Sequence, residues 1–296
     1  MNRCYEYVTV DVFTTARFKG NPLAVVPDAD GLSDAEMQAI AGEFNLSETV
    51  FLLPPNMRDA AVRARIFTPK RELAFAGHPT IGAAAVFCDR SGSAPPFVIE
   101  EKAGAIKIDA DKAGSKERIF CLTTPPVTFY ETVEPEFCAS LLGLNDHDVR
   151  ADILPTFASA GSPLLFICLQ SPEAVDRAEL QAQHLASALG SVDSVGTFIF
   201  ARQEAASSTN FNVYSRMFAP QTGIPEDPAS GGATGPLAAY MMRYNLLPRD
   251  VPATFVSEQG TKMGRQSFLH VRTEPSVSTI KVGGSTVAVG RGELQT

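Results

Sequence analysis

Two glycine-rich corners in the sequence have the composition of anion-binding helix starts. The first corner reads FAGHPTIG at positions 75–82 and the second reads PASGGATG at positions 228–235, and an Ala-rich segment follows each. The first N–H groups of a helix have no acceptor within the helix, and the helix dipole favours a negative charge beside them. We therefore predict that Gly77, in the first corner, and Gly231 and Gly232, in the second, bind a small carboxylate.

The same corners have a simpler interpretation as capped helix ends. Thr80 and Thr234 are of a residue type that caps helices, and the glycines would then only form tight turns. For one corner alone this interpretation is favoured. Two corners at matched positions favour a binding site, and Ser230 adds a hydroxyl group to the second one.

Glu48 is the residue best suited to acid/base chemistry. It lies in the stretch FNLSETVFLL, at the start of an apolar strand. Apolar surroundings favour the neutral form of a carboxyl group, which suits a general acid or base near neutral pH. The alternative is that Glu48 only caps an end of the strand or forms a surface ion pair. The duplicated segment has Gly196 near this position, so the fold itself does not require a carboxylate here.

Asp227 and His78 are the other candidates for catalysis. Asp227 precedes the second corner, where it could orient a substrate amine or hydroxyl, although an Asp-Pro turn explains it equally well. His78 lies inside the first corner, where it could donate a hydrogen bond or relay a proton. We assign no role to the other three histidines.

These candidates belong to a sequence that contains the same pattern twice, each copy being about half of the chain. Four pairs of segments recur in the same order: GNPLAVV with GSPLLFI, ETVFLL with VGTFIFA, RIFTP with RMFAP, and FVIEE with FVSEQ. A long repeat seen only twice indicates two similar domains rather than a solenoid. Prolines cluster near the join, which predicts an N-terminal domain at 1–125 and a C-terminal domain at 126–296.

Each copy predicts an α+β domain in which a curved mixed sheet surrounds a central helix. The helices after the two corners are apolar or small on nearly every face, as in a helix that is buried all round. Ser33 and Glu36 form a capping box for a separate amphipathic helix. Near the end of the chain, Gly283 and Gly284 predict the turn of a hairpin. The sequence leaves open whether the last strand stays with the second domain or crosses back to the first.

Composition restricts the partners of the chain. Its 296 residues have a net charge of −8 and no stripe of Lys and Arg, so we expect no nucleic-acid partner. No apolar run is long enough to cross a bilayer and no signal peptide is evident, which predicts no membrane partner and a cytoplasmic location. The five cysteines are scattered without a C-x-x-C pair, and no motif indicates a metal site or a serine hydrolase.

The ordered motifs VDVFT…FKGNPLAVV, NLSETVF, RIFTPKRELAFAGHPTIGAA and EDPASGGATGPLAAY resemble the PhzF-like isomerase family of phenazine biosynthesis. That family belongs to the diaminopimelate epimerase-like superfamily, and the resemblance covers the whole chain. It implies two pseudo-symmetric α+β domains with the active site in the cleft between them, a homodimer and no cofactor.

The resemblance also implies roles for individual residues. Its catalytic glutamate falls on Glu48, which would take a proton from one carbon of a dihydro-hydroxyanthranilate-type acid and return it to another. His78 and Asp227 would be substrate contacts or proton relays, and Asn21 and Ser47 lie in motifs that would bind substrate. The paired cysteines of two-base epimerases are missing, because the matching places hold His78-Pro79 and Gly232-Ala233.

One position departs from the family pattern. The second corner of the family usually reads Asp-Pro-Ala-Thr-Gly-Ser, whereas Gly232 replaces the hydroxyl residue in this chain. We therefore predict a cofactor-independent isomerase of a small carboxylic acid whose exact substrate is open. Two alternatives remain: a non-catalytic binding protein of the same fold, and an epimerase in which Glu48 and Asp227 act on opposite faces of an unusual substrate.

Overall fold

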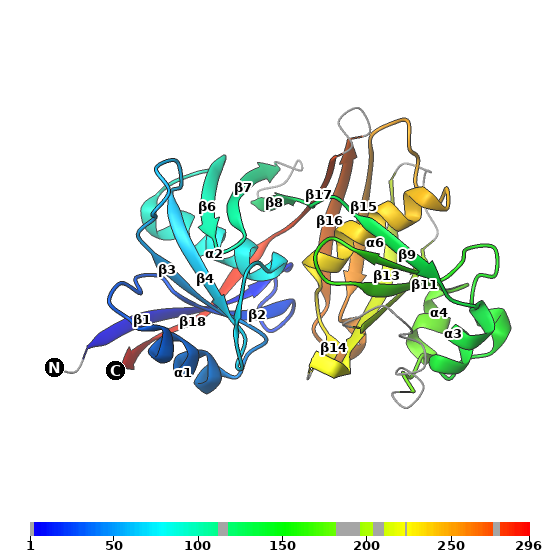
Figure 1. Cartoon of the computed structure of the whole chain (residues 1–296), viewed down its shortest axis with the longest axis horizontal. Coiled ribbons are helices and arrows are strands. Elements are labelled where there is room, and N and C mark those ends of the chain that lie inside the picture. The colour runs from blue at the N-terminus through cyan, green and yellow to red at the C-terminus, as the bar shows by residue number, and fades with distance from the viewer. Residues whose placement is uncertain (1–2, 112–117, 182–195, 204–209, 223, 275–278) are drawn as a thin grey trace. The chain divides into compact units, whose positions relative to one another are not determined.

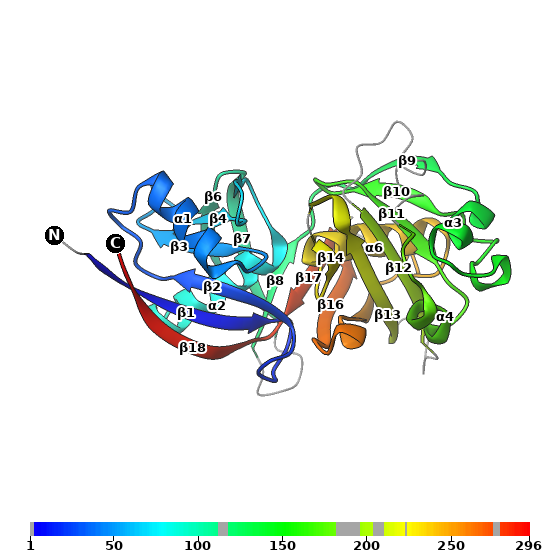
Figure 2. The same cartoon turned by 90° about the horizontal axis from the view of Figure 1, so that it is seen from below.

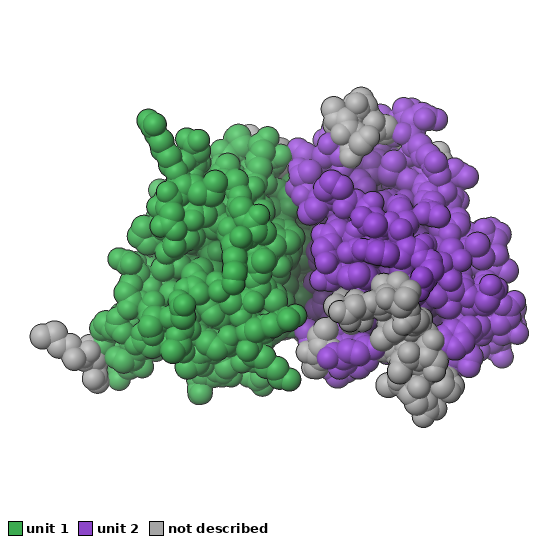
Figure 3. All heavy atoms as spheres, in the orientation of Figure 1, with its two compact units in different colours: residues 1–122, 283–296 green, residues 123–282 purple. Residues whose placement is uncertain are grey.

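A computed structural model describes residues 3–111, 118–181, 196–203, 210–222, 224–274 and 279–296. The chain forms two compact units, which are coloured separately in Figure 3. Unit 1 comprises residues 1–122 and 283–296, and unit 2 comprises residues 123–282. The division falls three residues before the join placed by the proline cluster, and the C-terminal strand belongs to unit 1.

Over its described residues, unit 1 is a mixed sheet with two helices. Across the sheet its strands are β18 (Thr286–Gln295), β1 (Cys4–Val12), β2 (Asn21–Val26), β3 (Thr49–Leu53), β4 (Val62–Phe67), β6 (Phe97–Glu101), β7 (Gly104–Asp111) and β8 (Ile119–Thr123). The pairs β2–β3 and β4–β6 are parallel and the others antiparallel, while the short β5 (Glu72–Leu73) pairs with β4. Figures 1 and 2 show β1 and β18 side by side.

The two helices of unit 1 form as their sequences predict. In α1 (Asp34–Phe44) the predicted capping box of Ser33 and Glu36 is present, and the helix ends at Asn45 in the left-handed conformation with φ of 49°. The second helix, α2 (Gly77–Ser91), packs against β1, β2, β3 and β4. Its small residues let it lie close to the sheet: a Cβ added at Gly82 would come within 2.4 Å of the Leu23 side chain.

Unit 2 repeats this topology. Its strands run β9 (Thr128–Thr132), β10 (Thr156–Ser159), β11 (Leu164–Cys168), β12 (Gly196–Arg202), β13 (Asn210–Ala219), β15 (Ala253–Gln259) and β16 (Ser267–Glu274), with β14 (Ile224–Asp227) paired to β13. The parallel pairs are β11–β12 and β13–β15, at the same places as in unit 1. The described helices are α3 (Pro135–Leu141), α4 (Pro172–Arg177) and α6 (Gly231–Arg243), with 3-10 turns at Asp146–Asp148, Pro220–Thr222 and Thr261–Met263.

Helix α6 is the counterpart of α2 and forms the centre of the unit 2 core. Leu237, Tyr240 and Met241 are fully buried, and the Tyr240 ring contacts the aromatic rings of Phe166 and Phe200. The Tyr240 hydroxyl donates a hydrogen bond to the Leu154 carbonyl, which satisfies the polar end of this side chain. Of the described helices, none is long and apolar enough to cross a membrane.

The predicted hairpin turn at Gly283 and Gly284 is wrong. Both glycines lie inside strand β17 (Thr279–Gly284), which pairs with β8 and is followed by β18 after a single residue. The glycines are needed for close packing. A Cβ at Gly283 would lie 2.5 Å from the Phe120 carbonyl oxygen, and one at Gly284 would lie 2.3 Å from the Phe13 ring. The last strand, β18, pairs with β1 of unit 1.

Candidate active site

The parallel pairing of β2 and β3 brings three predicted residues of unit 1 to one edge of the sheet. Asn21 is the first residue of β2, and Glu48 comes immediately before β3, which pairs in parallel with β2 from Ala24 and Thr49 onward. Because parallel strands begin at the same edge, the starts of both strands lie near each other. Asn21 is fully buried, and Ser47, one residue before Glu48, is half-buried.

His78 lies against Glu48. The imidazole Nε2 is 3.4 Å from Glu48 Oε2, and the side chains are only 7% and 14% exposed. His78 is the second residue of α2, so the start of this helix places the imidazole beside the carboxylate. The structure thus brings together two residues that the sequence had suggested separately.

The protonation of His78 follows from its surroundings. Burial lowers the pKa of His78 from 6.5 to about 3, and a hydrogen bond to the backbone of Pro22 opposes this only in part. Proline has no N–H, so the imidazole is the donor and the Pro22 carbonyl the acceptor. Nε2 makes no hydrogen bond to any described residue, which assigns the donated proton to Nδ1 and leaves a lone pair on Nε2. His78 is therefore a neutral hydrogen-bond acceptor on the side of Glu48.

The second corner begins a helix in the same way as the first. Gly77 is the first residue of α2 and Gly231 the first residue of α6. The residues before them, Ala76 and Ser230, make no side-chain capping hydrogen bond. The N–H groups of both first turns are therefore not capped by these side chains, as an anion-binding helix start requires.

The alternative reading of the threonines as helix caps is wrong. Thr80 Oγ1 lies 2.7 Å from the Ala76 carbonyl oxygen, and Thr234 Oγ1 donates to the Ser230 carbonyl at 2.9 Å. Both hydroxyls thus bond to a carbonyl four residues earlier in the chain instead of accepting from the free N–H groups.

In unit 2, Asp227 and Ser230 are linked through a buried amide. The Ser230 hydroxyl donates to Asp227 Oδ2. The Gln259 amide nitrogen donates to the Asp227 carbonyl at 2.7 Å and to Ser230 Oγ at 3.0 Å, and its oxygen accepts from the Ser230 N–H at 3.2 Å. Gln259 is fully buried. It fixes the backbone that leads from β14 into α6 and so fixes the second corner.

Gly232 is open to solvent, and a Cβ added there would meet nothing within 4 Å. The absence of a side chain at this position therefore does not serve packing within unit 2. This is the position at which the chain departs from the Asp-Pro-Ala-Thr-Gly-Ser pattern.

Sequence reasoning missed Gln259. The signal was nonetheless present in the duplicated pair FVIEE and FVSEQ, whose last residues are Glu101 and Gln259. Both end equivalent strands, β6 and β15, and both are buried. A buried carboxyl group and a buried amide group at matched positions indicate that the two residues have the same structural role.

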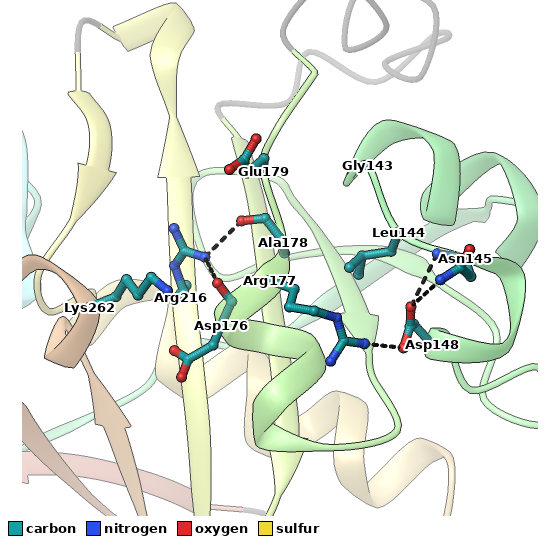
Figure 4. A pocket seen from close by; sticks show the side chains of 10 residues that line it. All are labelled: Gly143, Leu144, Asn145, Asp148, Asp176, Arg177, Ala178, Glu179, Arg216 and Lys262. Carbon is teal, nitrogen blue, oxygen red and sulfur yellow. Dashed lines mark hydrogen bonds and ion pairs between the residues drawn. The ribbon is translucent and has the colours of Figure 1, made fainter.

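A separate cavity of about 560 Å³ lies in unit 2, and Figure 4 shows the residues that line it. Its charged side chains largely pair with the protein itself. Arg177 donates to Asp148, and the buried Arg216 donates to Glu226 and to the carbonyls of Val175 and Ala178. None of the predicted site residues lines this cavity. Among the residues that the structure describes, no group of three or more His, Cys, Asp or Glu side chains is placed to hold a metal ion.

Comparison with known proteins identifies the family. A profile of the phenazine biosynthesis-like proteins, PhzC-PhzF, matches residues 10–292. The chain belongs to this family.

Individual relatives of the PhzF family support the assignment over the full length. An uncharacterized isomerase of Mesorhizobium japonicum is 37% identical, with 98% of each chain covered. The trans-2,3-dihydro-3-hydroxyanthranilate isomerase of Pseudomonas chlororaphis is 32% identical, covering 98% of this chain and 99% of the relative. The crystal structure of a PhzF family protein from Bacillus anthracis superposes with a TM-score of 0.88 at 25% identity, covering 99% of both chains.

These relatives confirm the predicted family, the α+β diaminopimelate epimerase-like fold and the enzyme class. At the level of its family the protein is an isomerase. The substrate, the roles of individual residues and the predicted homodimer stay predictions. So does the expectation that both corners face one cleft, because each unit is described by itself.

Proposed function

We propose that this protein is a cofactor-independent isomerase that moves a proton within a small carboxylic acid, with Glu48 as the acid/base. The observation that supports it most directly is the 3.4 Å approach of His78 Nε2 to Glu48 Oε2 at a largely buried edge of the sheet. The named activity of the Pseudomonas chlororaphis relative makes trans-2,3-dihydro-3-hydroxyanthranilate the first substrate to test.

In the proposed reaction Glu48 acts twice. Its carboxylate first accepts a proton from one carbon of the substrate, and the electron pair of the broken C–H bond shifts the double bond. Glu48 then returns the same proton to a different carbon, so that substrate and product have the same composition. General acid–base catalysis of this kind contributes roughly 10²–10⁴-fold in rate.

His78 supports the intermediate stage. Its Nε2 lone pair faces Glu48, whereas its Nδ1 proton is held by the Pro22 carbonyl. A lone pair beside a carboxyl group favours the protonated form of that group, which can donate a hydrogen bond to it. His78 thus stabilises Glu48 while Glu48 holds the proton, and it does so as a neutral base.

The helix starts supply the binding of negative charge. The side chains of Ala76 and Ser230 do not cap the first turns of α2 and α6, and we propose that the N–H groups at Gly77 and at Gly231 and Gly232 bind oxygen atoms of an acidic substrate. A helix N-terminus contributes about 0.3–1 kcal/mol to such binding when exposed, and more when partly buried. For Asp227, which accepts from the Ser230 hydroxyl, we propose contact with a substrate amine or hydroxyl. Asn21 and Ser47, at the edge that holds Glu48, are proposed to contact the substrate as well.

Turnover in deuterated water tests the proposal. The protein is incubated with trans-2,3-dihydro-3-hydroxyanthranilate, and the product is followed by proton NMR. A moved double bond with proton transfer between two carbons supports isomerisation. Inversion of a stereocentre without a moved double bond indicates an epimerase, and the absence of both turnover and exchange, with binding retained, indicates a binding protein.

A further inference from the structure

Glu101 is a buried carboxyl group beside the first turn of α2, and the reaction above does not use it. It is the last residue of β6 and is 5% exposed. Its Oε1 lies 2.5 Å from Thr80 Oγ1, and its Oε2 is buried without a hydrogen-bond partner among the described residues. Thr80 lies one turn into the helix that begins at Gly77 and presents His78.

The Thr80 hydroxyl makes two short contacts, and its single proton cannot serve both of them if Glu101 is a carboxylate. Thr80 Oγ1 is 2.7 Å from the Ala76 carbonyl and 2.5 Å from Glu101 Oε1, yet a hydroxyl has only one proton to donate. The carbonyl of Ala76 can only accept. Both contacts are satisfied when Thr80 donates to Ala76 and a protonated Glu101 donates to Thr80.

The other unit supports this reading independently. Gln259 ends the equivalent strand and is a neutral side chain that both donates and accepts around the equivalent helix start. A carboxylic acid has the same shape as this amide and the same combination of donor and acceptor, whereas a carboxylate only accepts. The two copies thus place chemically similar groups at the base of their corners when Glu101 is neutral.

The charged side chains around Glu101 do not offset the negative charge that an ionised Glu101 would carry. Basic side chains on the neighbouring strands, on α2 and in the turn after β6 lie against other groups: His78 against Glu48, Arg63 against Glu100, Arg65 against Asp34 and Glu72, Arg90 against Glu6, Lys102 against Glu72 and Lys107 against Asp109. Burial raises the pKa of Glu101 from 4.5 to about 8, although the hydrogen bond with Thr80 acts in the opposite direction.

We propose that Glu101 is a positioning residue, held as a neutral carboxylic acid, that donates a hydrogen bond to Thr80 and thereby fixes the helix turn bearing Gly77 and His78. It touches neither the substrate nor Glu48 in this proposal and acts only through α2. Its effect on turnover rests on the proposed function, whereas its protonation does not.

Infrared spectroscopy of the full chain tests the protonation directly. At pH 7 we expect a carbonyl band of a protonated carboxylic acid that is lost in Glu101→Gln and retained in Glu43→Gln, a control that removes an exposed glutamate of the same unit. Wild-type protein without such a band, or a band that persists in Glu101→Gln, would overturn the proposal. If Glu101→Gln does not fold, Thr80→Val removes the hydroxyl that accepts from Glu101, together with its hydrogen bond to Ala76, and keeps the Glu101 carboxyl group. The band is then expected to shift, and an unshifted band is the contrary result.

Turnover of trans-2,3-dihydro-3-hydroxyanthranilate tests the positioning role. Wild type is expected to lose kcat/KM as the pH rises through about 8, because ionised Glu101 no longer donates to Thr80. Glu101→Gln keeps a donor at all pH values, so we expect it to retain wild-type activity at pH 7 and to lack this alkaline loss. An identical alkaline loss in both proteins contradicts the positioning role. A missing turnover in wild type together with a present infrared band contradicts the proposed function alone.

Discussion

Glu48 and Gly196 occupy the same position in the two units. Each comes one residue before a fully buried threonine, and this threonine is the first residue to pair with the next antiparallel strand. Thr49 pairs with Phe67, and Thr197 pairs with Phe218 in the same register. In unit 2 no side chain fits at this position, because a Cβ on Gly196 would lie 2.0 Å from the Phe218 carbonyl oxygen. In unit 1 the same position carries the glutamate side chain of Glu48. This difference between two otherwise equivalent places supports the role proposed for Glu48.

Replacing Glu48 by Gln is expected to abolish turnover without unfolding the protein. The amide has the size of the carboxyl group but cannot accept and return a proton, so kcat/KM should fall by about 10²–10⁴-fold. Steady-state assays with trans-2,3-dihydro-3-hydroxyanthranilate measure this loss, and circular dichroism checks the fold. The exposed Glu43→Gln, which makes the same chemical change on α1, should behave as wild type. Full activity of Glu48→Gln would remove this residue from the mechanism.

Features that depend on local sequence were predictable. Both central helices begin at the glycines that the duplicated corners indicated, Gly77 and Gly231, and α1 begins at its capping box. These signals are local because a helix start is determined by the residues around it. Glu48 and His78 were also identified one by one from their own surroundings.

Features that depend on partners distant in the sequence were not predictable. The contact of His78 with Glu48 arises from the parallel pairing of β2 with β3 and from the packing of α2 on both. Gln259 was missed because its hydrogen bonds to Asp227 and Ser230 span about thirty residues. Gly283 and Gly284 were taken for a turn because close approach of another backbone selects the same residue type.

The neutral state of His78 predicts an acid-dependent loss of stability. An unfolded chain protonates this histidine below pH 6.5, whereas the folded protein does so only near pH 3. The unfolded state therefore binds more protons between these values, and the free energy of unfolding decreases as the pH falls from 6.5 towards 3. The contribution of one group is at most about 1.4 kcal/mol per pH unit.

Urea unfolding between pH 4 and 7 measures the contribution of His78. We expect His78→Gln to lose less stability on acidification than wild type, since glutamine does not titrate. His147→Gln, at an exposed position in unit 2, is the matched control for the loss of a histidine and should follow wild type. Parallel pH profiles for wild type and His78→Gln would show that His78 is protonated in the folded protein.

Arg216 and Arg65 are equivalent in the two units but differ in burial, so their removal is expected to affect stability differently. Arg216 is 9% exposed, binds Glu226 through two nitrogens at 2.9 and 3.0 Å, and also donates to backbone carbonyls. Its counterpart Arg65 is 21% exposed and pairs with Glu72 and with the exposed Asp34. Removing one partner of a buried ion pair costs about 3–5 kcal/mol, whereas a more exposed charged hydrogen bond is worth about 1.5–3 kcal/mol.

We therefore expect Arg216→Ala to destabilise unit 2 more than Arg65→Ala destabilises unit 1. Because two units need not unfold together, hydrogen exchange read by mass spectrometry is the appropriate measurement. Protection should decrease around α4, β13 and β14 in Arg216→Ala, and around β4 and β5, to a smaller extent, in Arg65→Ala. An equal loss in the two variants would contradict the link between burial and cost.

Gly232 and Gly235 lie in the same helix, α6, but differ in the space available for a side chain. At Gly232 a new side chain would meet open space, and a helical glycine costs about 0.8–1 kcal/mol relative to alanine. At Gly235 a Cβ would lie 2.2 Å from the Thr124 hydroxyl, and overpacking of this kind costs about 1–3 kcal/mol. Gly232→Ser should thus leave unit 2 equally or more stable, and Gly235→Ala should weaken it, as measured by hydrogen exchange across α6. Gly232→Ser also adds the hydroxyl usual in the family, so we expect kcat/KM to be at least that of wild type. A stable Gly232→Ser protein with a tenfold lower kcat/KM would instead show that the substrate approaches the bare backbone at this glycine.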